Sequence, residues 1–246
     1  MVTLTKRGQS SFTPYSHQAW ELKRNSLRLL MRIVVFPWMI RMGKVDGLEN
    51  IPREGPALIL MNHIAFVDPI VVMHVLPRNI VPLAKIEVYD YPVVGIFPKL
   101  WGVIPVRRNE IDRRAIRQAI DVLNAGELVL VAPEGTRNDS LRRGKEGIAY
   151  LAGKTGAPVV PVALEGTPGF PTYPFSKRWR GEKAVIRVGK PFRYKQAFRN
   201  ARAKTLRKMT DEAMYILAGM LPEHRRGVYE NLEDATMDTI EWVDPV

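Results

Sequence analysis

The sequence predicts an α/β fold in which a mostly parallel sheet is flanked by helices and preceded by an N-terminal amphipathic helical appendage. Short apolar runs bounded by turn residues alternate with longer segments whose apolar residues recur at helical spacing, and this alternation is typical of βα units. The chain has 246 residues, of which 46% are hydrophobic, so one large domain can bury a core. It contains no cysteine, which excludes disulfides, thiolate nucleophiles and cysteine-bound metals.

The apolar runs are expected to form the strands of this sheet. They cover residues 57–61, 80–84, 102–106, 128–132, 159–164 and 184–188. Helical spacing predicts helices over residues 20–41, 68–76, 110–124, 146–155 and 203–220. Asp68 and Pro69 are typical of an N-cap and a first helical residue, and Pro77 of a helix end. In the helix expected over 110–124, Ile111 is among the residues predicted to face the core.

Charge divides the chain unevenly. We expect a helical appendage at 1–43, a main domain at 44–228 and an acidic tail at 229–246. The tail holds six acidic residues and no Lys or Arg, although the whole chain carries a net charge of +12. A surface this basic favours partners that carry phosphates, whether nucleic acid, anionic lipid headgroups or a phosphorylated substrate.

The expected N-terminal helix has a basic face, because Arg24, Arg28 and Arg32 recur every four residues. The helix either packs on the core of the protein or lies on a membrane. In the second case the arginines would contact anionic headgroups, the apolar surface of 27–38 would reach the acyl boundary and Trp38 would lie at headgroup level.

Apolar runs in this sequence are short compared with a membrane span. A spanning helix needs roughly 18 to 20 apolar residues, whereas the longest uninterrupted run, 33–40, has eight and includes Pro37. We therefore expect a monotopic or peripheral protein on the cytoplasmic face of a membrane, without a transmembrane span.

A histidine and an aspartate share the loop that follows the expected strand 57–61. His63 and Asp68 are five residues apart, and open α/β sheets place ligand sites at this end of a strand. A continuous helix would turn the two about 140° apart, whereas a loop lets them face each other. A carboxylate on one imidazole nitrogen raises the basicity of the other, so the pair could take a proton from an alcohol. The alternative is an N-cap aspartate beside an incidental histidine.

Two further motifs carry groups that suit phosphate. The run Pro-Glu-Gly-Thr-Arg at 133–137 follows the expected strand 128–132, and its Thr136 and Arg137 supply hydrogen-bond donors. Taken alone, this run could be an ordinary polar turn. The stretch 85–107 begins with Lys85 and ends with Arg107, with two glycines and several apolar residues between the two cations.

In this order the motifs resemble those of the glycerolipid acyltransferase family, specifically its 1-acylglycerol-3-phosphate O-acyltransferase branch. The resemblance covers about residues 44–195 and includes a fourth motif, Val160-Pro161-Val162. Each motif is weak alone, but the four in one order are specific. Many members carry serine where this chain has Asn138.

The resemblance implies a role for each matching residue. His63 is implied as the general base and Asp68 as its orienting partner. The implied acceptor-binding residues are Lys85, Arg107, Glu134, Gly135, Thr136 and Arg137, with Arg137 on the phosphate. Val160 and Pro161 match the segment that the family places near the acyl donor. Lys145 and Gly147 match a Lys-x-Gly pattern of the family.

The implied reaction moves a fatty acyl group from acyl-CoA or acyl carrier protein to the sn-2 hydroxyl of lysophosphatidic acid, which gives phosphatidic acid. Glycerol 3-phosphate or another lysophospholipid is the alternative acceptor, and a basic membrane- or nucleic-acid-binding scaffold without catalysis is the alternative of another class. The basic stretch 177–208 could suggest nucleic acid, but it contains no zinc-ligand spacing and no aromatic-rich RNA motif. We therefore expect a membrane surface and no nucleic acid as partner, and neither a cofactor nor a metal ion.

Overall fold

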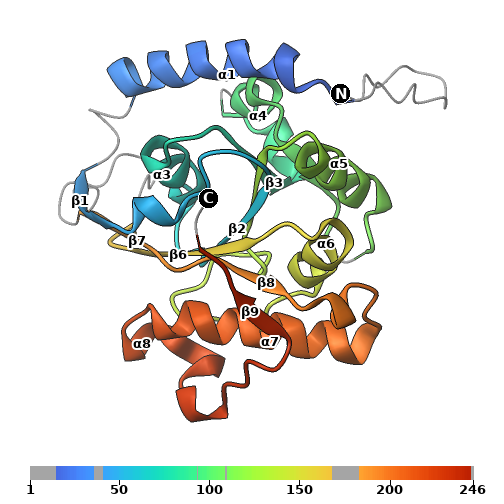
Figure 1. Ribbon diagram of the computed structural model, residues 1–246. Coiled ribbons are helices and arrows are strands. Elements are labelled where there is room, and N and C mark those ends of the chain that lie inside the picture. The colour runs from blue at the N-terminus through green and yellow to red at the C-terminus, as the bar shows by residue number, and fades with distance from the viewer. Residues whose placement is uncertain (1–14, 36–40, 93, 109, 168–182, 245–246) are drawn as a thin grey trace.

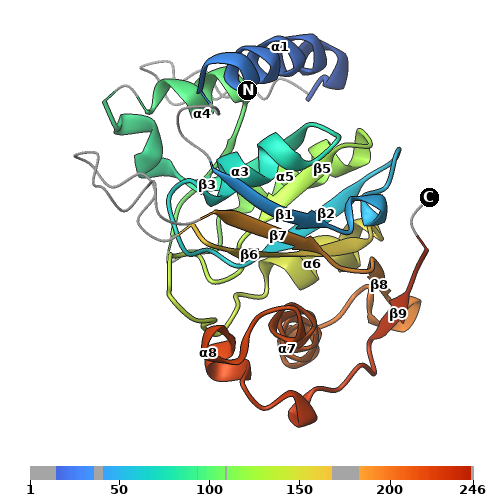
Figure 2. The same cartoon turned by 90° about the vertical axis from the view of Figure 1, so that its left-hand side faces the viewer.

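A central sheet with helices on both faces forms the body of the protein (Figures 1 and 2). The computed structural model describes residues 15–35, 41–92, 94–108, 110–167 and 183–244, without the side chains of His17, Gln18 and Val35. The predicted α/β class with a mostly parallel sheet is confirmed, since most strand pairs of the described residues are parallel.

Nine strands form this sheet within the described residues. They are β1 Met42–Asp46, β2 Ala57–Met61, β3 Ile80–Lys85, β4 Ile104–Val106, β5 Leu128–Val131, β6 Val159–Glu165, β7 Ala184–Val188, β8 Phe192–Tyr194 and β9 Ile240–Trp242. The order is β1-β7-β6-β2-β5-β3-β4, and β8 pairs with β6 and β9. The pairs β6–β2, β2–β5, β5–β3 and β3–β4 are all parallel. The carboxyl ends of these strands therefore meet at one edge of the sheet.

The central strands are buried because helices cover both of their faces. Leu58 and Leu60 of β2 pack with α5 (Arg113–Asn124), α6 (Gly147–Thr155) and α7 (Ala203–Gly219). Ile59 and Met61 point the other way, toward α3 (Asp68–Val75) and the buried Trp101. This alternation places apolar side chains on both faces of one strand, which explains why β2 reads as a continuous apolar run.

The start of α5 and the cap role of Asp68 differ from the sequence-based expectation. α5 begins at Arg113, where Asp112 caps it by accepting from the backbone N–H groups of Arg114 (3.1 Å) and Ala115 (3.0 Å). Ile111 therefore precedes the helix and is 81% exposed, so its predicted core position is wrong. α3 begins at Asp68 without a side-chain cap bond, so the N-cap role predicted for Asp68 is also wrong. Its carboxylate turns back toward the preceding loop.

The acidic C-terminal segment packs against the main domain. β9 pairs with β8, and α8 (Glu223–Arg226) follows α7 along the chain. The buried carboxylate of Glu212 in α7 accepts hydrogen bonds from Thr236 Oγ1 (2.8 Å) and from the backbone N–H groups of Asp238 (3.1 Å) and Thr239 (3.0 Å). Because a buried carboxylate needs such donors, residues 236–239 are held firmly on α7.

The N-terminal helix, α1 (His17–Leu30), continues into a π-helical turn (Met31–Val35) and lies across α4 (Ile96–Trp101) (Figure 1). Its Arg24 side chain is only 1% exposed and forms an ion pair with the buried Glu127, which precedes β5. Arg24 Nε also donates to the Trp101 carbonyl (2.9 Å), and Arg24 Nη1 to the Tyr15 hydroxyl (2.6 Å).

The rest of the basic face also points toward the protein. Arg28 donates to the carbonyls of Leu76 and Pro77, and Arg32 to the carbonyl of His74 (3.3 Å). Of the two alternatives, the structure shows packing on the protein for Arg24 and Arg28, whereas Arg32 stays exposed. Trp38 lies outside the described residues.

Apolar side chains occupy the outward face of this helix instead. Five large ones are between 53% and 75% exposed, namely Leu22, Leu29, Leu30, Ile33 and Val34. α4, which packs against α1, exposes Ile96 and Leu100 on one of its own faces. We call these seven residues the outer apolar surface. Among the described residues, no helix has the length and apolar character of a membrane span.

Candidate active site

Residues of three sequence motifs meet at the edge formed by the carboxyl ends of the parallel strands. His63 follows β2, the turn at 133–137 follows β5, Lys85 ends β3 and Arg107 follows β4. These four strands are consecutive neighbours in the sheet, and Lys85 pairs directly with Val106. Segments that lie far apart in the sequence therefore border one surface, the type of site that open α/β sheets use for ligands.

His63 and Asp68 face each other across the loop after β2. The His63 Nδ1 atom lies 2.9 Å from Asp68 Oδ2. Because a carboxylate can only accept, Nδ1 carries the shared proton and Nε2 keeps its lone pair. The His63 side chain is 18% exposed, whereas Asp68 is fully buried. The imidazole can therefore reach a substrate while the carboxylate cannot.

Backbone hydrogen bonds in the loop before Asp68 hold that carboxylate in place. Asp68 Oδ2 also accepts from the backbone N–H groups of Ile64 (2.6 Å) and Ala65 (2.7 Å). Asn62 fixes the start of the same loop on β6, since its side chain exchanges two hydrogen bonds with the Leu164 backbone, at 3.0 and 2.8 Å. Both arrangements position His63 without a direct contact with substrate.

The segment after β5 forms hydrogen bonds with both backbone groups of His63. The His63 N–H donates to Glu134 Oε1 (3.3 Å), and the His63 carbonyl accepts from the Asn138 N–H (2.8 Å). Sequence reasoning gave no positioning role to Asn62 or Asn138. Asn62 and Asn138 stand next to His63 and Arg137 in the sequence, but their contacts with the Leu164 and His63 backbone join segments that are far apart along the chain.

The carboxylate of Glu134 points into the protein rather than toward the surface. Its Oε2 accepts from the Arg142 N–H (2.9 Å) and from Asn138 Nδ2 (3.1 Å), in addition to the Oε1 contact with His63. Burial raises the pKa of Glu134, although these hydrogen bonds lower it. The structure thus gives Glu134 protein contacts, where the resemblance implied a substrate contact.

The cations at this edge remain largely open to solvent. Thr136 and Arg137 are exposed, as is Arg107, whose Nη1 lies 3.9 Å from Glu110. Lys85 is half-buried, with its Nζ 5.2 Å from the centre of the Tyr91 ring. Such guanidinium and ammonium groups can bind a phosphate.

Val160 and Pro161 lie away from this group. Both are buried in the middle of β6, where they pair with Ile59 and Leu60 of β2. The structure therefore does not bring their side chains to the edge that carries the other motif residues.

The assembled site can perform one kind of chemistry well. A neutral imidazole whose Nδ1 is held by a carboxylate can take a proton through Nε2, and the cations beside it can hold an anionic group of the same substrate. No group of three or more His, Asp or Glu side chains suited to a metal ion occurs among the described residues.

Comparison with known proteins agrees with this geometry. The family model described as Acyltransferase matches residues 43–165. The 1-acyl-sn-glycerol-3-phosphate acyltransferase of Borreliella burgdorferi is 38% identical over 130 residues, which are 51% of this chain and 52% of that protein. The Bacillus subtilis protein of the same name is 35% identical over 127 residues, covering 50% of this chain and 62% of its own. The chain thus spans roughly half the length of these curated relatives.

The fold has a solved counterpart. The crystal structure of the 1-acyl-sn-glycerophosphate (LPA) acyltransferase PlsC from Thermotoga maritima aligns with a TM-score of 0.59 over 89% of this chain and 83% of that chain, at 23% sequence identity. At this identity the similarity concerns the fold. The family model covers the strands β1 to β6, which carry every motif of the site. The chain therefore belongs to the acyltransferase family.

Proposed function

We propose that this protein transfers a fatty acyl group from an acyl-CoA or acyl carrier protein thioester to the sn-2 hydroxyl of lysophosphatidic acid, giving phosphatidic acid. The observation that carries this proposal is the His63–Asp68 pair at 2.9 Å, on the same sheet edge as Lys85, Arg107 and Arg137. Relatives named 1-acyl-sn-glycerol-3-phosphate acyltransferase support the choice of acceptor.

The chemistry needs only the base and the two substrates. His63 Nε2 takes the proton of the acceptor hydroxyl as that oxygen attacks the thioester carbonyl. The new ester C–O bond forms, the C–S bond breaks, and the proton passes from the imidazole to the departing thiolate. Transfer is direct, so no acyl group is attached to the protein.

The acceptor panel that tests this proposal contains lysophosphatidate, glycerol 3-phosphate, lysophosphatidylcholine and monoacylglycerol. We expect the highest kcat/KM with lysophosphatidate, because monoacylglycerol has no phosphate for the cations and glycerol 3-phosphate has no acyl chain. Equal turnover of lysophosphatidate and monoacylglycerol would show that the phosphate is not recognised. Absence of turnover with all four acceptors would contradict the enzyme function itself.

Replacing Arg137 tests its assignment to the acceptor phosphate. Arg137→Ala should raise the acceptor KM by about 10- to 100-fold, since a charge-assisted hydrogen bond contributes roughly 1.5–3 kcal/mol. Arg137→Lys should restore part of this loss, because a point charge replaces a bidentate fork. Initial rates at varied acceptor and donor concentrations measure the effect.

Arg202→Ala is the matched control. Arg202 precedes α7 and is exposed. Arg202 lies close in sequence to Asn200, whose side chain accepts a hydrogen bond from Lys154 Nζ (3.3 Å). Lys154 is in the last turn of α6, the end of that helix that is far from the site. The control should keep the acceptor KM of the wild type. A change in the donor KM alone in Arg137→Ala would show that the assignment is wrong.

We further propose that the protein meets its lipid substrate at a membrane surface through the outer apolar surface. Its exposed Leu, Ile and Val side chains gain free energy when they leave water for the acyl boundary. Because the basic face of α1 is turned inward, the helix should bind mainly through apolar burial. Salt screens charge attraction and affects apolar burial far less, so binding should persist at high salt.

The double variant Leu29→Ser/Ile33→Ser should lower vesicle binding by roughly tenfold for each residue that is buried there. Flotation with lipid vesicles at low and high salt measures the loss, and activity on vesicle-borne acceptor should fall with it. Ile111→Ser is the matched control, because Ile111 is 81% and Ile33 67% exposed. If the double variant floats as well as the control, the membrane contact lies elsewhere.

A further inference from the structure

The loop 138–146, between β5 and α6, is tied to the acceptor motif along its inner side. Arg142 N–H donates to Glu134 Oε2 (2.9 Å), and Lys145 N–H donates to the Pro133 carbonyl (2.9 Å). The loop therefore leaves the turn 133–137 and folds back onto it. Its backbone position and that of the motif depend on each other.

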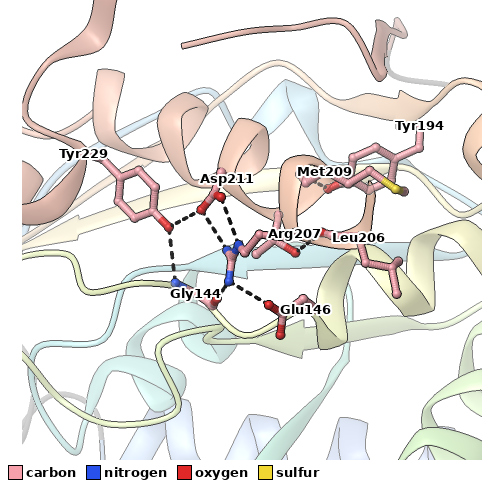
Figure 3. A network of polar contacts seen from close by, with 9 residues as sticks. Gly144, Glu146, Tyr194, Leu206, Arg207, Met209, Asp211 and Tyr229 are labelled. Atoms are coloured by element: carbon pink, nitrogen blue, oxygen red, sulfur yellow. Dashed lines mark hydrogen bonds and ion pairs between the residues drawn. The ribbon is translucent and has the colours of Figure 1, made fainter. Parts of the chain in front are cut away.

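A polar network that includes Arg207 and Asp211 of α7 holds the same loop (Figure 3). Arg207 of α7 donates to the Gly144 carbonyl (2.6 Å) and to Glu146 (2.9 Å), and it forms a bidentate pair with Asp211. The Tyr229 hydroxyl accepts from the Gly144 N–H (3.3 Å) and donates to Asp211 (2.9 Å). Burial raises the pKa of Tyr229 to about 12, so its hydroxyl keeps the proton that it donates. Both backbone groups of Gly144 are thus occupied.

The segment 225–228 adds a second hold on the loop. The Leu141 N–H donates to the Arg225 carbonyl (2.9 Å), and the Val228 N–H donates to the Leu141 carbonyl (3.1 Å). A Cβ at Gly227 would lie 2.1 Å from the Leu141 carbonyl oxygen, and Gly227 has a φ of +55°. Only glycine permits this approach without strain. Arg207, Tyr229 and the segment 225–228, which contact the loop, all follow residue 165, where the match to the family model ends.

The loop held in this way places the side chain of Lys145 next to the turn 133–137. A Cβ at Gly135 would lie 3.4 Å from both Lys145 Cε and Nζ, so the lysine stem lies over the turn of the acceptor motif. Nearby carboxylates are already engaged: Glu146 and Asp211 with Arg207, and Glu134 with backbone donors. Lys145 is exposed and has no ion pair within the described part of the chain. A cation without a counter-charge thus lies against the acceptor motif.

We infer that Lys145 is a further binding residue for the anionic phosphate of the acceptor, and that Arg207, Asp211 and Tyr229 act as its positioning network. The inference rests on the proposed function for the identity of the acceptor. The chemical class that it requires is a phosphate monoester beside a hydroxyl. Fixing the loop in advance lowers the ordering cost of binding, which explains why a lysine on a loop can contribute to affinity.

The first test is Lys145→Met, which removes the charge and keeps the apolar stem. It should raise the KM for lysophosphatidate about tenfold, the usual scale for one charge-assisted contact, and leave the donor KM and kcat unchanged. It should not affect monoacylglycerol, which has no phosphate. Lys154→Met is the matched control, because this exposed lysine lies at the other end of α6. A Lys145→Met enzyme that behaves like the control, or that loses both acceptors equally, overturns the inference.

The second test is a double-mutant cycle with Tyr229→Phe, which keeps the ring and removes the hydroxyl. Tyr229→Phe alone should raise the KM for lysophosphatidate by a smaller factor. In the Lys145→Met background this effect should disappear, because Tyr229 acts through Lys145. Independent, multiplying effects would show that Tyr229 supports the fold and does not position the lysine.

A binding measurement separates this inference from the proposed reaction. Titration of a short-chain lysophosphatidate into the wild type and Lys145→Met, without any donor, needs no turnover. About tenfold weaker binding to the variant supports the inference even if the transfer assay fails. Equal binding to both proteins overturns it even if transfer succeeds.

Discussion

Replacing His63 with alanine should lower kcat by roughly 10²- to 10⁴-fold, the usual contribution of a positioned general base. The variant should fold normally, because the His63 side chain is partly exposed and the loop is held through its backbone by Glu134 and Asn138. The acceptor KM should change little, since the cations that bind phosphate remain in place. Initial rates and a thermal melt of the purified variant measure both expectations.

His224→Ala is the matched control for that loss. His224 is exposed in α8 and has no place in the proposed reaction, so its replacement should leave the rate unchanged. Near wild-type turnover in a folded His63→Ala protein would show that the base is another group.

Replacing Arg24 should produce the largest loss of stability. Arg24→Ala leaves the buried Glu127 without its ion-pair partner, and breaking a buried pair from one side costs about 3–5 kcal/mol. It also removes the donor of the Trp101 carbonyl, whereas the Tyr15 hydroxyl loses Arg24 but keeps its hydrogen bond to Glu127. Urea unfolding, followed by circular dichroism, measures the change in the free energy of unfolding.

The double variant Arg24→Met/Glu127→Leu separates charge from packing. Removing both charges should recover most of the lost stability, because apolar side chains of similar size can replace a buried ion pair. Lys23→Ala, which changes an exposed neighbour in α1, should leave the free energy of unfolding nearly unchanged. Equal stability of Arg24→Ala and Lys23→Ala would mean that α1 is not anchored through this pair.

The fold class could be read from the sequence because the central strands are buried on both faces. Residues 57–61 and 128–131 are continuous apolar runs for that reason. The three-residue strands β8 and β9 were not predicted, since their pairing joins residues 192–194 to 240–242 and has no local pattern. α4 also escaped prediction, because six residues that include Pro98 show too little helical periodicity.

The site was predicted only in part, because many of the residues that contact each other there are far apart in the sequence. The His63–Asp68 pair is local, so its loop could be recognised. The partners of Glu134 are backbone groups of His63 and Arg142, and no sequence pattern reveals such contacts. The arginine stripe of α1 was visible, but the sequence does not say which way it faces. Its direction depends on Glu127, which lies 103 residues from Arg24.

The central claim is that His63 activates the acceptor hydroxyl for direct transfer, and the path of a labelled acyl group tests it most directly. Purified protein is mixed with a labelled acyl thioester, first alone and then with lysophosphatidate. We expect no label on the protein in the first step and labelled phosphatidate in the second, with the second step slowed by roughly 10²- to 10⁴-fold in His63→Ala. Label that becomes covalently bound to the protein, or phosphatidate that His63→Ala forms at the wild-type rate, would contradict the account.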